Sequence, residues 1–550
     1  MYKLRKLFGY EKHLDKYPLY IVKGKRTLRE IVNKKTVKCI NKYVNKTLSQ
    51  KQSKDFLKIF RKEYVSLYLS HYFRSKIYFK ISKNEIQRYL KNKDYYLSIF
   101  DIDFVDIIYI FKIFLKLINF TFIKFFKKTN VGNFEKCDIL IEYLNGDNSN
   151  KKDFPYKREL LKKNKNIKLK YLFSSNLSLD GIKGLDNFKD KYISRARNTK
   201  LKYKPFYVNE ISSETKKAIW ICLKNFIKNP LIFSIYLEFI INYEYYNQLI
   251  SNLNIKIYVN STWDQNIPVV RQALYKNSGK NIAFQYSYTG NKEDSFLDHA
   301  NDIVFSWGRD AEKNLNKKKN FIEKIYKINP AHLKYNFNIK KQKQKQKQKQ
   351  KIITIFDSSF NKDGFISPET YNKFLKIIIE SVLLNKNLKL YMKHKYISFE
   401  KYIDLNNQKL IKKLKLNKRY KSFHGSKIKN SKLIANSDLV VSINSLSISA
   451  EALLNDTDSL NLCNSSMDKN FLKKLNKLCP FAYYDFSEFE KNFYKKLKFK
   501  KQNYKIKRLK NFFFENNKKK IDPVNYINNF LYKDSSTVNL IKLYKFNEKN

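Results

Sequence analysis

The segment Ile434–Leu454, IANSDLVVSINSLSISAEALL, holds side chains well suited to bind a phosphate. Leu439–Ile443 reads as a short buried strand of a parallel sheet. Asn444–Ser447 then supplies amide and hydroxyl groups where a new helix begins. A helix N-terminus has free N–H groups and a positive dipole end, so it can bind phosphate. Ser445 and Ser447 are therefore candidate phosphate ligands; the alternative is that they only cap the helix.

Two further positions could complete such a site. Glu451 lies one turn into the predicted helix, where a carboxylate could bind a sugar hydroxyl or simply complement the helix dipole. A second predicted strand, Leu388–Met392, ends in Lys393 and His394. These basic side chains could pair with a diphosphate, or they could belong to an ordinary lysine-rich surface turn.

Candidate residues also occur in the first half of the chain. Asp264 follows the predicted strand Ile255–Val259, and Gln285 ends the predicted strand Asn281–Gln285. Ligands of open α/β sheets bind at the carboxyl ends of strands, so both positions are candidates for catalysis. Asp264 could act as a base, and the alternative for it is a solvated loop aspartate.

The elements that would position these residues fall into two series of alternating strands and helices. Such alternation predicts a parallel sheet in each series, and therefore two Rossmann-like α/β domains. We place them at residues 131–338 and 352–550. Residues 339–351 contain the run KKQKQKQKQKQK, which cannot bury apolar surface and is typical of a linker. Residues 1–130 read as a mostly helical, basic region.

The formal net charge of +63 invites a nucleic-acid-binding function. The basic residues, however, are 99 lysines and only 13 arginines, spread along the whole chain. Proteins that recognise nucleic-acid bases or phosphates favour arginine, because its planar guanidinium group donates two parallel hydrogen bonds. We therefore expect no specific nucleic acid partner, while a general attraction to anionic surfaces remains open.

The cysteines and histidines indicate no metal centre. The five cysteines are scattered without a CxxC pair, and the six histidines do not cluster near them. A reducing compartment and no bound metal or cofactor are expected. The N-terminus lacks the apolar core of a secretory signal, so we expect a cytoplasmic protein.

The segment Phe104–Phe126, FVDIIYIFKIFLKLINFTFIKFF, approaches the length of a membrane-spanning helix. Its charged and amide side chains, however, fall on about half of the helix circumference. This pattern suits an amphipathic helix, packed either on its own domain or on an anionic membrane surface. Peripheral attachment to the inner face of the cytoplasmic membrane is one of these two possibilities.

Four stretches of the chain resemble one family of enzymes. They resemble parts of the GT-B-fold glycosyltransferases of bacterial surface polysaccharide synthesis and the related CDP-glycerol glycerophosphotransferase group. In chain order, these parts are a helix and strand that end in a Gln-His-Gly-like turn, a strand-Trp-Gly-helix unit, a strand that delivers a Lys/His pair to the cleft, and the donor-phosphate loop with its Glu-Ala-Leu helix. These stretches are RQALYKNSGKNIAFQYSYTG (Arg271–Gly290), DIVFSWGRDAEKNL (Asp302–Leu315), LKLYMKHK (Leu388–Lys395) and SDLVVSINSLSISAEALL (Ser437–Leu454).

The resemblance implies a GT-B-like fold that transfers a sugar from a nucleotide-activated donor to a glycan or lipid-linked acceptor. It also implies that helix dipoles and basic side chains, rather than a metal, stabilise the leaving diphosphate. The chain has Gln285-Tyr286-Ser287 where the family has a Gln-His-Gly-like turn, so no role of that histidine is carried over.

Three other functions stay open. A glycerol- or ribitol-phosphate transferase would keep the fold and change the donor. A non-catalytic protein of polysaccharide biosynthesis or export would keep glycan binding alone. A basic nucleic-acid-binding protein would show a steep dependence of affinity on salt.

Overall fold

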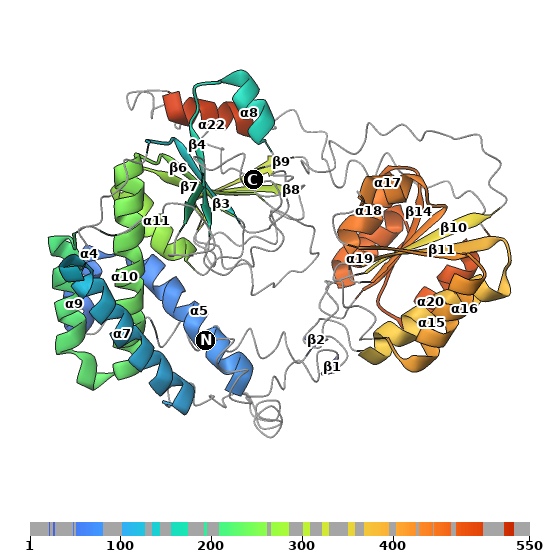
Figure 1. Ribbon diagram of the computed structural model, residues 1–550, viewed down its shortest axis with the longest axis horizontal. Coiled ribbons are helices and arrows are strands. Elements are labelled where there is room, and N and C mark those ends of the chain that lie inside the picture. Colours follow the sequence, from blue (N-terminus) through green and yellow to red (C-terminus); the bar gives the residue numbers. More distant parts are fainter. Residues whose placement is uncertain are drawn as a thin grey trace, which may run out of the picture.

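We analysed a computed structural model of the chain (Figure 1). The description covers residues 21–22, 26–27, 44, 48, 51–80, 102–126, 135–143, 154, 156–173, 192–194, 208, 210–260, 266–284, 301–307, 322–328, 350–357, 368–394, 403–424, 428, 430–443, 445–463, 469–498 and 522–532. The candidate residues Asp264 and Gln285, and the Lys/Gln run up to residue 349, lie outside the described residues.

The first domain is built on a seven-stranded sheet in which all strands are parallel and lie in the order β5-β4-β3-β6-β7-β8-β9. The strands are β3 (Ile139–Tyr143), β4 (Leu169–Phe173), β5 (Tyr192–Ser194), β6 (Ile257–Asn260), β7 (Lys280–Phe284), β8 (Ile303–Trp307) and β9 (Lys324–Ile328). Central strands are apolar and buried because helices cover both faces of a parallel sheet. The order reverses between β3 and β6.

A layer of helices packs beside this sheet (Figure 1). Its members are α4 (Lys51–Ile59), α5 (Lys62–Lys80), α7 (Phe104–Phe126), α9 (Ser213–Lys224), η3 (Phe226–Lys228), α10 (Pro230–Leu253) and α11 (Ile267–Lys276). Helix α10 is almost wholly buried and contacts α5, α7, α9 and α11. Aromatic rings fill the layer, for example Phe56 stacked on Tyr236 with ring centroids 4.9 Å apart.

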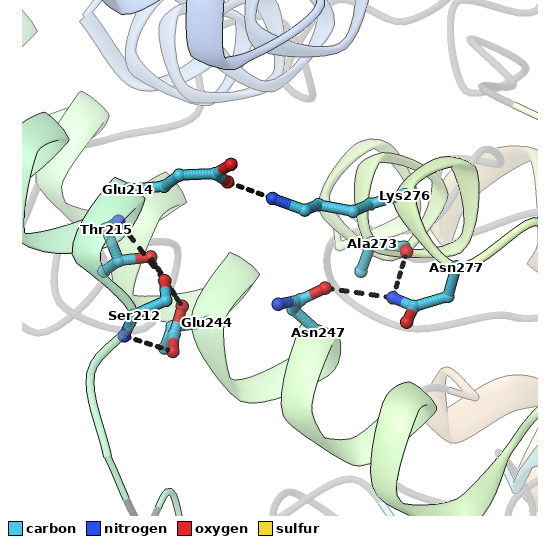
Figure 2. A network of polar contacts seen from close by, with 8 residues as sticks. All are labelled: Ser212, Glu214, Thr215, Glu244, Asn247, Ala273, Lys276 and Asn277. Carbon is cyan, nitrogen blue, oxygen red and sulfur yellow. Dashed lines mark hydrogen bonds and ion pairs between the residues drawn. The ribbon is translucent and has the colours of Figure 1, made fainter.

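Polar contacts fix α10 to its two neighbours (Figure 2). The carboxylate of Glu244 accepts hydrogen bonds from the Ser212 N–H (2.9 Å), the Ser212 hydroxyl (2.8 Å) and the Thr215 hydroxyl (2.5 Å). This arrangement satisfies the buried glutamate and anchors the start of α9. On the other side, Asn277 donates to Asn247 of α10 at 3.0 Å. The helical layer is therefore joined to the sheet domain through α11.

The second domain contains a six-stranded parallel sheet in the order β12-β11-β10-β13-β14-β15. Its strands are β10 (Lys351–Phe356), β11 (Leu388–His394), β12 (Tyr420–His424), β13 (Leu439–Ile443), β14 (Asp458–Leu462) and β15 (Ala482–Tyr483). Its helices are α15 (Pro368–Leu384), α16 (Leu405–Leu416), α17 (Asn430–Ala435), α18 (Leu446–Leu454), α19 (Lys469–Leu478) and α20 (Phe486–Lys496). Helices α15, α16 and α20 cover one face, and α17, α18 and α19 cover the other (Figure 1).

The last helix among the described residues, α22 (Pro523–Tyr532), follows the second domain in sequence but packs on the first (Figure 1). It lies beside α8 (Lys157–Lys163), and Asn525 bonds to Lys163. The Tyr526 ring contacts Phe305 and Tyr326, with centroids 6.0 and 5.2 Å apart. The chain therefore passes between the two domains twice.

Two sheets of this kind confirm the predicted fold class, a two-domain GT-B-like α/β protein with a helical region before the first sheet. The domain boundaries remain proposals, and α22 shows that packing does not follow them at the C-terminal end. A two-stranded antiparallel ribbon, β1 (Ile21–Val22) and β2 (Arg26–Thr27), precedes the helices. Among the described residues, no helix combines the length and apolarity needed to cross a membrane.

Candidate functional site

The strand order of the second sheet reverses between β10 and β13, which are hydrogen-bonded neighbours. The carboxyl ends of strands at such a reversal form the crevice where ligands of open α/β sheets bind. Phe356, near the end of β10, pairs in register with Ser442 of β13 and with Lys393 of β11. Lys393 and His394 end β11, and Ser445, Ser447 and Glu451 follow the end of β13. The predicted phosphate- and sugar-binding residues therefore all lie along this one side of the sheet.

Asn461 of β14 organises the turn between β13 and α18. Its Oδ1 accepts hydrogen bonds from the Ser442 hydroxyl at 2.8 Å and from the Ser445 N–H at 3.0 Å. A hydroxyl has one proton, and that of Ser442 is donated to Asn461. The Ser449 hydroxyl, 2.8 Å from that of Ser442, must therefore be the donor in the bond between the two serines. Ser442, Ser449 and Asn461 have no exposed surface. Leaving one such buried group unpaired costs about 1–3 kcal/mol, so the network holds the turn in one conformation.

Helix α18 begins without a side-chain cap. Ser445 occupies the N-cap position, but its hydroxyl accepts no hydrogen bond from the first turn. By helix geometry the first N–H groups of α18 have no partner inside the helix. Ser447 is half-buried in this first turn, and Glu451 is buried one turn further along. The three predicted residues Ser445, Ser447 and Glu451 thus lie on one helix start, at the reversal point.

Lys393 and His394 end β11 but lie on opposite faces of the sheet, because side chains alternate along a strand. Lys393 lies on the α17 side, where its Nζ donates to the Ile428 carbonyl at 2.6 Å and also to the Asn430 side chain. His394 is fully buried on the face of Met392, among the α15 and α16 contacts. Lys393 therefore shares the face of Ser442 and α18, and His394 does not.

The first sheet reverses its order between β3 and β6. Strand β6 ends at the buried Asn260, and the segment with Asp264 that follows is outside the described residues, as is Gln285 after β7. Their proposed catalytic role remains a prediction that depends on the position of two strand ends.

Sequence reasoning missed Ser442, Ser449 and Asn461 as residues that position the turn. A signal was present for Ser442, which is a polar residue inside the otherwise apolar, buried strand β13. What the sequence alone did not supply is the register that places Ser442 opposite Asn461.

The nearby thiol of Cys463 is buried. Burial raises the pKa of Cys463 to about 12, although the Asn461 side chain 3.0 Å away acts against the rise. A thiol that stays protonated is a poor nucleophile and a poor metal ligand. Within the described ranges, no group of three or more His, Cys, Asp or Glu side chains could hold a metal ion.

Comparison with known proteins gives structural likeness only. No family model matches the sequence, and no curated protein matches it. The chain is similar to the UDP-GlcNAc 2-epimerase from Neisseria meningitidis bound to UDP-GlcNAc, with a TM-score of 0.42 and 12% identity over 74% of this chain and 100% of that one.

Two structures of other proteins are also similar to the chain. Anabaena Alr3699/HepE in complex with UDP and glucose has a TM-score of 0.38 and 11% identity, over 74% of this chain and 100% of that one. Acinetobacter baumannii MurG has a TM-score of 0.37 and 8% identity, over 66% and 91%. The strand orders given above, rather than these scores, establish the α/β fold.

Proposed function

We propose that this protein is a glycosyltransferase that takes a sugar from a nucleotide-activated donor, bound at the start of α18. One observation carries the proposal. The uncapped N-terminus of α18 lies at the strand-order reversal of a parallel sheet, and Asn461 holds its turn in place. A diphosphate there would accept backbone N–H bonds and meet the positive end of the helix dipole.

In the proposed reaction, an acceptor hydroxyl oxygen forms a bond to the anomeric carbon of the donor sugar. The bond from that carbon to the diphosphate oxygen breaks, and a base removes the hydroxyl proton. The helix start and Lys393 would stabilise the leaving diphosphate, and Glu451 would bind the ribose. Asp264 is the proposed base and Gln285 its neighbour in the acceptor-side domain. No bound metal is part of this proposal.

The acceptor proposed here is a glycan or a lipid-linked precursor of a bacterial surface polysaccharide. A cytoplasmic location, with attachment to the inner face of the membrane, belongs to the same hypothesis. A glycerol- or ribitol-phosphate transferase is the second candidate, because the same helix start would bind a CDP-linked donor equally well. A non-catalytic glycan-binding or export protein is the third.

Calorimetric titration with UDP-, GDP-, CDP- and CMP-linked donors tests the proposal. Charge-assisted hydrogen bonds are worth about 1.5–3 kcal/mol, so Glu451→Ala should weaken donor binding roughly 10- to 150-fold. Ser447→Ala should have a smaller effect because backbone donors remain. Glu488→Ala, on the exposed face of α20, is the matched control and should bind like wild type.

Thermal unfolding of each variant shows whether lost binding reflects lost folding, since Glu451 is buried. Equal affinity in wild type and all variants would move the donor site elsewhere. If folded wild type bound no nucleotide at all, the non-catalytic candidate would replace the transferase. Tight binding confined to CDP-linked donors would favour the glycerol- or ribitol-phosphate transferase.

A further inference from the structure

Helix α7 has charged and polar side chains on the side that faces the protein. Asp106 is fully buried and accepts a hydrogen bond from the Tyr72 hydroxyl at 2.9 Å. Tyr109 donates to Glu238 of α10 at 2.6 Å, and Lys116 donates to Asn242 of α10 at 3.1 Å. Two of the polar positions that the sequence grouped on one half of this helix therefore bond to protein: Asp106 is fully buried, and Lys116 is bonded to α10 with 38% of its side chain exposed.

The outward side of α7 is apolar. Five large side chains recur there at intervals of three or four residues, and each keeps about half or more of its surface exposed. They are Phe104 (59%), Ile107 (55%), Phe111 (64%), Leu115 (45%) and Ile118 (50%). Exposed apolar residues are normal when scattered singly, whereas a continuous stripe of this size marks an interaction surface. We call these five residues the α7 stripe.

A second element, far away in sequence, extends the apolar surface. Phe114 of α7 packs edge-on against Phe226 of η3, with ring centroids 4.9 Å apart. The next residue, Ile227, is 92% exposed. Exposed lysines stand on both sides of it, at Lys224 and Lys228.

The charges near this surface indicate what covers it. Within the described part of α7, the exposed charged residue is Lys112, and the flanks of Ile227 are also basic. A second copy of a chain with net charge +63 would bring like charges together at this face. An anionic lipid surface would instead neutralise the lysines and bury the apolar side chains.

We propose that the α7 stripe and Ile227 form a docking surface for an anionic lipid bilayer, with α7 lying parallel to the membrane plane. The helix cannot turn to span the bilayer while its inward side is bonded to α10 along its length. The side chains of the stripe would enter the boundary between headgroups and acyl chains, and the lysines would stay among the headgroups. This inference rests on the membrane attachment proposed above and assigns a surface to it. It is independent of the transferase activity, because the surface belongs to the helical layer rather than to the α18 turn.

Vesicle flotation with the full-length protein tests the inference. The vesicles are mixtures of phosphatidylglycerol and phosphatidylcholine, compared with phosphatidylcholine alone. The test variant is Phe111→Ser with Leu115→Ser, two exposed positions whose replacement leaves the core intact. The matched control is Leu384→Ser with Leu416→Ser, which are 88% and 75% exposed on α15 and α16.

Wild type and control should bind the anionic vesicles equally, and the test variant should bind about 100-fold less, or about tenfold for each side chain. Binding to phosphatidylcholine alone should be weaker for all three. The inference is overturned if wild type does not bind anionic vesicles, or if test and control variants behave alike. It is also overturned if the test variant only converts a dimer into a monomer, measured by light scattering, because a second copy would then be the occupant.

Discussion

In these parallel sheets all strands begin along one side, the amino edge, and end along the opposite side, the carboxyl edge. The two sides differ in chemistry. At the amino edge, charged residues just before the strands hold neighbouring strands in register. Three aspartates do this by accepting an N–H from the start of the adjacent strand: Asp138 from Lys168 (2.8 Å), Asp302 from Asn281 (2.8 Å) and Asp438 from Ile352 (2.9 Å). A basic side chain pairs with two of them, Arg271 with Asp302 and Lys351 with Asp438.

Among the described residues at the carboxyl edge of the second sheet, the side chains that hydrogen-bond at the turn before α18 are the neutral ones of Ser442, Ser449 and Asn461. A carboxylate in the place of Asn461 could accept the same N–H, but it would oppose an incoming phosphate. Charge therefore serves strand register at the amino edge, while the neutral hydrogen bonds at the carboxyl edge add no negative charge at the positive helix end, where we propose that the diphosphate binds.

The largest effect should follow from breaking the buried pair at the amino edge. In Asp302→Ala, the guanidinium of Arg271, whose side chain is 4% exposed, loses its nearer carboxylate at 2.6 Å and retains Glu323 at 3.7 Å. Breaking a buried pair in this way costs about 3–5 kcal/mol of unfolding free energy. Urea denaturation followed by tryptophan fluorescence measures the loss.

The matched control for that variant is Asp438→Ala. Its lysine partner Lys351 has 53% of its side chain exposed, so we expect a loss of about 1–2 kcal/mol, most of it from the hydrogen bond to Ile352. Equal losses in the two variants would show that the amino-edge aspartates act through backbone bonds alone.

A smaller and more selective effect is expected at the carboxyl edge. In Asn461→Asp, the carboxylate still accepts from Ser442 and from the Ser445 N–H, but it is buried and loses the amide contact to Cys463, so stability should fall by about 1–3 kcal/mol. The added negative charge should also weaken nucleotide binding at least tenfold, which is about 1.4 kcal/mol. Calorimetry and thermal unfolding on the same samples separate the two effects. Unchanged nucleotide affinity would argue against a phosphate at this helix start.

The sequence predicted the central strands well, and of the four outermost strands of the two large sheets it predicted only β15. Strands β10 and β13 are apolar runs that are buried on both faces, so their composition alone identifies them. Strands β5, β9 and β12 are outermost strands of their sheets, and the sequence did not predict them. In β12, Lys421 and Ser422 are exposed, because an edge strand needs no continuous apolar run.

The candidate site was predicted in part for a similar reason. Local composition identified the α18 start, since Ser445 and Ser447 stand where a strand gives way to a helix. Asn461 contacts that turn from a different strand, so its role depends on strand pairing that no local pattern encodes. Side chains alternate between the two faces along β11, so adjacent residues such as Lys393 and His394 must lie on opposite faces once the strand is known to include both.

The smallest effect concerns pH. Burial lowers the pKa of Lys496, with Asp458 at 3.6 Å acting against the shift. Between the lowered pKa and 10.5, the unfolded chain binds more protons than the folded one, so stability should rise with pH across that window. Lys496→Met should remove this rise, a change of about 1 kcal/mol or less. Lys495→Met, its exposed neighbour, should keep the rise in denaturation curves taken from pH 8 to 10.5.

The return of α22 to the first domain has a consequence for the order in which the protein is made. A ribosome releases residues 139–328, which contain all strands of the first sheet, long before it releases Pro523–Tyr532. Until then, the rings of Phe305 and Tyr326 lack their contacts with Tyr526. The first domain to be synthesised is thus the last to be completed. A nascent chain stalled before residue 523 would carry a finished second domain beside an unfinished first one.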